Sequence, residues 1–146
     1  MPVASSIDLA ALAVRLRIVN GRLHRRLRQS AQGELAISHL SALATIARLG
    51  PVGPSEVATA EQVSRPSMTS IVNALEAAGL VTRRADPADR RRATLTATSA
   101  GQRLLDRTRR QRAAYLARRL RELPEQEVRV LNDAVAILER LLEVSR

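Results

Sequence analysis

The chain of 146 residues contains no cysteine. This absence excludes disulfides, thiolate metal sites and thiol-based redox sensing. The only histidines, His24 and His39, lie in no local metal-binding motif, and we interpret them as surface or packing residues. The sequence also has no phosphate loop, metalloprotease motif or nucleophile elbow, and no serine pairs with a histidine and an acid at an informative spacing. We therefore expect no enzyme activity, no metal and no cofactor.

Aromatic residues make up 1% of the chain, since Tyr115 is the only tyrosine and there is no Phe or Trp. The core must be built from small aliphatic side chains, which favours a second chain to complete it. No run approaches the roughly 18 consecutive apolar residues of a membrane span. Residues 1–8 lack the basic and then apolar order of a signal peptide. We expect a cytoplasmic protein without a membrane partner.

Lysine is absent as well, and all 24 basic residues are arginine. The net charge is +10 and the pI is about 11.7. Such an excess of positive charge indicates a polyanionic partner, with nucleic acid ahead of an anionic membrane. The length is typical of one domain.

Apolar periodicity predicts a mainly α fold with one small β-hairpin. In the first helix, leucines and a valine recur every three or four residues, close to a heptad repeat. Ser38 is the expected cap of the second helix, and Pro54 suits the start of the third. The expected helices are 7–29, 38–49, 55–61, 65–78, 100–121 and 124–144, and the expected strands are 80–84 and 93–97.

The third and fourth helices are separated by only Gln62, Val63 and Ser64, and a hairpin follows them. This order is typical of a winged helix-turn-helix. In the fourth helix one face is apolar at helical spacing, and the other carries small polar side chains that can approach base edges. An ordinary amphipathic surface helix is the alternative. The candidate DNA-binding residues are Arg65, Pro66, Ser67, Met68, Thr69, Ser70 and Asn73.

The hairpin loop is rich in arginine and is narrow enough to enter a minor groove. Its alternative interpretation is a solvated run of charge. The candidate DNA-binding residues of the hairpin are Arg83, Arg84, Asp89, Arg90, Arg91 and Arg92.

The run from Gly79 to Arg91, followed by Leu95-Thr96 and Gly101, resembles the multiple antibiotic resistance regulator (MarR) family. The resemblance extends over nearly the whole chain. It implies a single winged-helix domain, 1–146, that forms a homodimer through helices 7–30 and 100–146. The DNA-binding core would be 38–98, with the helix-turn-helix at about 54–78 and the wing at about 80–97. The resemblance also implies that Asp89 steadies Arg91 as this arginine enters the minor groove.

Expected dimer contacts come from the apolar faces of the first and last helices: Leu9, Leu12, Leu16, Leu131, Val135, Leu138, Leu141 and Leu142. A two-fold dimer should read a near-palindromic operator, with half-sites about one helical turn apart. The family resemblance further implies a small-molecule effector in a cleft between the dimer helices and the winged domain. The sequence places few aromatic side chains there.

The predicted function is a sequence-specific transcriptional repressor that binds double-stranded DNA and responds to an effector. Two alternatives remain open on the residues alone. One is an architectural protein that coats DNA without a preferred sequence. The other is a helical interaction module whose basic faces meet acidic protein or membrane surfaces, although this gives the wing no role.

Overall fold

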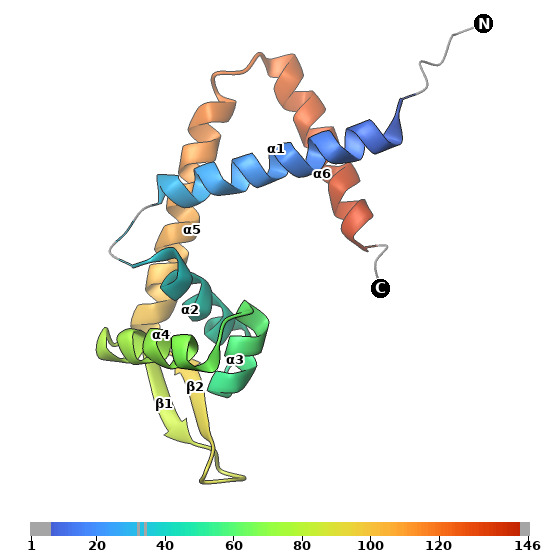
Figure 1. Cartoon of the computed structure of the whole chain (residues 1–146). Coiled ribbons are helices and arrows are strands. Elements are labelled where there is room, and N and C mark those ends of the chain that lie inside the picture. Colours follow the sequence, from blue (N-terminus) through green and yellow to red (C-terminus); the bar gives the residue numbers. More distant parts are fainter. Residues whose placement is uncertain (1–6, 32, 34, 144–146) are drawn as a thin grey trace, which may run out of the picture.

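A computed structural model describes residues 7–31, 33 and 35–143. The fold is mainly α-helical with one two-stranded antiparallel hairpin, as the periodicity predicted (Figure 1). The winged helix lies at one end of the long helix α5, and α1 and α6 lie toward its other end (Figure 1). The elements are α1 (Leu9–Ser30), α2 (Ile37–Leu49), α3 (Pro54–Glu61), α4 (Arg65–Ala77), β1 (Val81–Ala85), β2 (Ala93–Ala97), α5 (Ser99–Leu120) and α6 (Glu125–Glu143).

The hydrophobic core belongs to the winged helix. Helices α2, α3 and α4 pack against one another, and β2 and the first turns of α5 close the cluster. Leu43, Ile46, Leu75 and Leu95 are completely buried. Because these side chains come from α2, α4 and β2, the core fixes α4 and the hairpin in one rigid unit.

The prediction that Ser38 caps α2 is wrong. The helix begins one residue earlier, at Ile37, after Ala36, which offers no side-chain cap. The Ala36 carbonyl instead accepts the Leu40 N–H at 3.0 Å. Burial of the α2 face that carries Leu43 sets the helix register here, and it outweighs the local capping preference of a serine.

A tight junction connects α4, β1 and α5. Gly79 ends the α4 turn with φ of +71°, a conformation that favours glycine. Thr98 caps α5 by accepting the Gly101 N–H at 3.1 Å, and its hydroxyl donates to the Gly79 carbonyl at 2.7 Å. The Leu80 carbonyl accepts the Thr98 N–H at 2.9 Å, so Leu80 belongs to the junction, and β1 starts one residue later than predicted.

Helices α1 and α6 have little to pack against. Helix α1 contacts α5, yet no residue of α1 is buried. Helix α6 has no buried residue and no extensive packing partner among the described residues. None of the helices in residues 7–31 and 35–143 is both long enough and apolar enough to cross a membrane.

Candidate nucleic-acid interface

A serine side chain caps the N-terminus of helix α4. The Ser64 hydroxyl accepts the Ser67 N–H at 3.2 Å, and the two serine hydroxyls lie 2.8 Å apart. Pro66 occupies the first turn, where its missing N–H costs no helical hydrogen bond. The cap therefore defines where the helix begins and leaves the Arg65 side chain exposed beside it.

The two faces of α4 differ as the sequence predicted. The inward face, Met68, Ile71, Val72 and Leu75, is buried in the core. The candidate groove residues on the other face are all exposed: Arg65, Pro66, Ser67, Thr69, Ser70 and Asn73.

The prediction that Met68 contacts the DNA groove is wrong. Its side chain is 1% exposed and belongs to the core cluster, so it cannot reach a base edge. The helical period puts Met68 on the same face as Ile71, Val72 and Leu75, and packing on that face excludes contact with DNA.

Beyond α4, the hairpin extends away from the core (Figure 1). Strands β1 and β2 pair antiparallel, with Arg83 opposite Leu95 and Ala85 opposite Ala93. Of the strand residues only Val81 and Leu95 are buried, so the hairpin is more exposed than a half-buried ribbon. The end of the hairpin therefore presents its loop to solvent.

Two aspartates shape that loop. The Asp86 carboxylate accepts the Ala88 N–H at 2.9 Å, and the Asp89 carboxylate accepts the Arg91 N–H at 3.0 Å. Both are local turns in which a carboxylate replaces a backbone acceptor. The Asp86 N–H also donates to the Arg92 carbonyl at 2.9 Å, which closes the loop at its base.

Asp89 also faces two of the loop arginines. Its carboxylate lies 3.6 Å from Arg91 Nε and 3.9 Å from Arg92 Nε. The Arg91 side chain is nevertheless 94% exposed, and Arg90 is exposed too. The structure thus brings together the predicted Asp89–Arg91 pair and leaves the guanidinium groups accessible to a phosphate or a groove.

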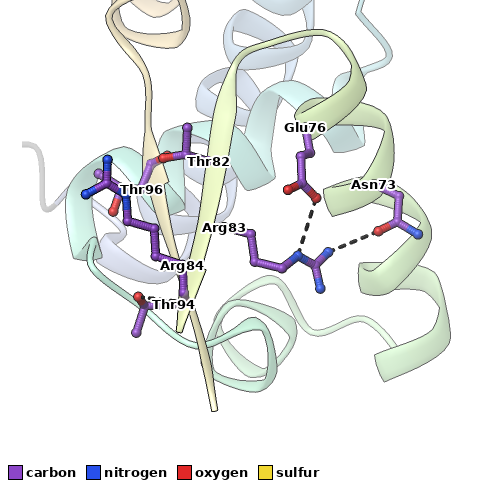
Figure 2. A network of polar contacts seen from close by, with 7 residues as sticks. All are labelled: Asn73, Glu76, Thr82, Arg83, Arg84, Thr94 and Thr96. Atoms are coloured by element: carbon purple, nitrogen blue, oxygen red, sulfur yellow. Dashed lines mark hydrogen bonds and ion pairs between the residues drawn. The ribbon is translucent and has the colours of Figure 1, made fainter. Parts of the chain in front are cut away.

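Arg83 has a different environment from the loop arginines. Its Nε donates to Glu76 Oε2 at 3.3 Å, and its Nη2 donates to Asn73 Oδ1 at 3.0 Å (Figure 2). Both partners lie on α4, one turn apart. Arg84 points to the opposite side of the strand, away from α4 (Figure 2). Sequence reasoning missed Glu76, because the contact joins a helix to a strand across a turn and no local spacing signals it.

A cavity of about 680 Å³ lies along α5, which supplies half of its lining, and is bordered by Ala78 and Leu80 at the α4–β1 junction and by Leu35 and Leu40. A smaller one of about 220 Å³ adjoins it between α1, α2 and α5, and is lined by His24, Arg28, Arg109 and Arg112 among others. The Nε atom of Arg112 is buried without a hydrogen-bond partner among the described residues. Among the described residues that line these two cavities there is no Phe, Trp or Tyr, whereas Tyr115 lines a third on α5.

The predicted dimer residues are exposed in the single chain. Leu138 is 37% exposed and Leu142 is 77% exposed, and the other members of the set fall between these values. They are Leu9, Leu12, Leu16, Leu131, Val135 and Leu141.

Comparison with known proteins gives consistent matches. The sequence model of the MarR family matches residues 35–93. An HTH-type transcriptional regulator of Mycobacterium tuberculosis is 34% identical over 137 residues, covering 93% of this chain and 96% of the relative. The crystal structure of a transcriptional regulator protein from Pseudomonas aeruginosa matches with 36% sequence identity and a TM-score of 0.78. The match covers 91% of this chain and 94% of that protein. Streptococcus pneumoniae FabT, solved in complex with DNA, has a similar fold at 21% identity, with a TM-score of 0.59 and coverage of 94% and 98%.

Proposed function

This chain belongs to the MarR family of DNA-binding transcriptional regulators, and from that premise we propose that it is a repressor. It acts in the cytoplasm as a homodimer on a near-palindromic operator. Residues 38–98 bind DNA, and residues 7–30 and 100–146 form the dimer. The observation that carries the proposal is the exposed polar face of α4 beside an arginine-tipped hairpin on the same rigid core.

The roles at the DNA follow from groove geometry. Helix α4 enters the major groove with the small side chains Ser67, Thr69 and Ser70, which do not hold the helix away from the base edges. The Thr69 hydroxyl donates to the Arg65 carbonyl at 3.0 Å, so toward DNA it acts as an acceptor. The wing tip enters the adjacent minor groove through Arg91, with Arg90 and Arg92 placed to contact phosphates.

Dimerisation is supported by the two helices that the single chain leaves uncovered. Burying their exposed leucines and valines against a second copy would complete a core that one chain lacks. The charges are complementary too. The arginines of α1 are Arg15, Arg17, Arg22, Arg25, Arg26 and Arg28, with no acidic residue, whereas α6 carries Glu125, Glu127, Asp133, Glu139 and Glu143 against Arg129 and Arg140.

The effector response is supported by the cavities between α1, α2 and α5. Arg28, Arg109 and Arg112 line the smaller one, and Arg112 Nε is a buried donor with no acceptor among the residues that the structure describes. These groups favour an anionic small molecule. The cavity also touches α2, which packs on α4, so a ligand there can shift the DNA-binding helix relative to α5.

The experiment is a selection of duplexes from a random pool, followed by titration of the selected duplex and a shuffled one at fixed salt. We expect a specific-to-non-specific affinity ratio of roughly 10³ or more. Equal affinities would instead identify an architectural DNA-coating protein. Two chains carry 2 × (+10) = +20, so both affinities should fall steeply with salt, and only the ratio separates the two functions.

A transcription assay then tests repression. With the selected duplex placed across a promoter, the purified protein should lower transcript yield, and a shuffled duplex at the same place should not respond. An increase in transcript yield would identify an activator.

A further inference from the structure

We infer that Arg83, Glu76 and Asn73 form a clasp that holds the wing at a fixed angle to α4, with Arg83 acting as a positioning residue. The inference rests on the proposed function, because it concerns how the DNA-reading surface is set. It changes the role expected for two residues that the sequence assigns to DNA contact, Arg83 and Asn73.

The geometry of the clasp is that of a fork. One guanidinium donates through Nε to Glu76 and through Nη2 to Asn73, on successive turns of α4 (Figure 2). A planar guanidinium offers these donors at fixed angles, so the two contacts together restrict the strand more than either one alone. The Arg83 side chain is 34% exposed, against 94% for Arg91 and 79% for Arg92. Arg83 is thus already engaged, while the loop arginines remain accessible.

The clasp lies at a position where a small rotation changes the direction of the wing. Beyond Arg83 the hairpin continues through Arg84 and Ala85 to a loop, residues 86–92, none of which belongs to the hydrophobic core cluster. Val81 anchors β1 on the core side of the clasp, and Leu95, which pairs with Arg83, anchors β2. The clasp is therefore the outermost described link between the hairpin and α4. A small rotation there moves the loop relative to the helix, and binding in two adjacent grooves depends on that spacing.

Asn73 is affected as well. A free asparagine can pair with adenine by donating through Nδ2 and accepting through Oδ1. Here Oδ1 already accepts from Arg83, so the amide is held with Nδ2 directed away from the guanidinium. Glu76 meanwhile compensates the charge of Arg83 and reduces its pull toward a phosphate.

The test compares Arg83→Gln, Arg83→Lys and Glu76→Ala with the control Arg110→Gln, which removes an exposed arginine on α5, outside the clasp and the DNA-contact set. The probes are the selected duplex and the shuffled duplex, titrated over a salt series. For all three clasp variants we expect the specific-to-non-specific ratio to fall by about tenfold, the size of one lost base contact. Arg110→Gln should leave the ratio unchanged, because it removes the same charge and touches neither the clasp nor the proposed DNA contacts.

Several results would overturn the clasp. If Arg83 contacts a phosphate instead, Arg83→Gln lowers the magnitude of the salt slope by about 0.9 per subunit, or about 1.8 for the dimer, and Arg83→Lys behaves as wild type. If Glu76 acts only as a charge, Glu76→Ala strengthens binding to both duplexes, whereas the clasp predicts weaker operator binding despite the loss of a negative charge. The variant carrying both Glu76→Ala and Arg83→Gln should be no worse than Arg83→Gln alone, because Arg83→Gln already removes both contacts of the clasp.

Hydrogen exchange gives a readout that does not depend on operator preference. In the free protein, amides of residues 80–97 should exchange faster in Glu76→Ala than in wild type and in Arg110→Gln. Equal exchange in wild type and Glu76→Ala would rule the clasp out even if the wild type showed no preferred DNA sequence. Failure of the proposed function and failure of the clasp are thereby distinguished.

Discussion

The Nε atom of Arg91 lies 3.6 Å from Asp89 Oδ1, and the same oxygen accepts the Arg91 backbone N–H at 3.0 Å. One carboxylate oxygen therefore positions both the main chain and the side chain of Arg91. Since the side chain is 94% exposed, the ion pair adds little to stability, and its consequence is the direction in which the guanidinium points.

Arg91→Ala should weaken operator binding by about 1–3 kcal/mol, the range for one specific contact. Operators with A·T-rich flanks should lose most, because a narrow minor groove attracts arginine most strongly. Fluorescence anisotropy with flank variants of the selected duplex measures this. Arg110→Ala, an exposed arginine on α5, is the control. Unchanged operator affinity in Arg91→Ala would falsify the wing role.

The close approach of α5 to the α4–β1 junction leads to a second prediction. A β-carbon at Gly101 would collide with the Leu80 carbonyl oxygen and press on the Leu43 side chain. Gly101→Ala should therefore destabilise the fold by about 1–3 kcal/mol through overpacking. Gly21→Ala is the matched control, because nothing lies within 4 Å of a β-carbon there, and it should stabilise α1 by about 0.5–1 kcal/mol. Urea unfolding of both variants measures the difference, and a Gly101→Ala protein as stable as wild type would contradict the packing.

Local patterns predicted most of what local physics decides. The apolar period predicted an inward face for α4, which Met68 and Leu75 occupy, and the two expected strands predicted the hairpin and the position of its loop. Contacts between residues far apart in the sequence could not be predicted from these local patterns. No spacing relates Arg83 to Glu76, and burial of α2 decided its start against the preference of Ser38. Met68 was predicted to contact the groove, although the helical period places it on the same face as Leu75, which packs into the core.

The buried donor of Arg112 gives a third prediction. Its Nε has no partner among the described residues, and His24, Arg28 and Arg109 line the same cavity. Leaving a buried donor unpaired costs about 1–3 kcal/mol. Arg112→Met keeps the aliphatic stem and removes the donor, so it should raise the melting temperature. Arg110→Met, on an exposed face, should not. A lower melting temperature for Arg112→Met would show that the guanidinium makes a stabilising contact in the assembled protein.

Leu138→Glu tests the proposed dimer surface on α6. Leu138 is 37% exposed in the single chain, among the lower values on that helix, and a second copy should bury it fully. An unpaired carboxylate buried there costs several kcal/mol, so we expect monomers and loss of operator binding. Asn132→Glu adds the same charge to the same helix outside the apolar set and should leave the dimer intact. Sedimentation velocity gives the mass of each variant. A stable Leu138→Glu dimer that still binds the operator would mean that a different surface joins the two chains.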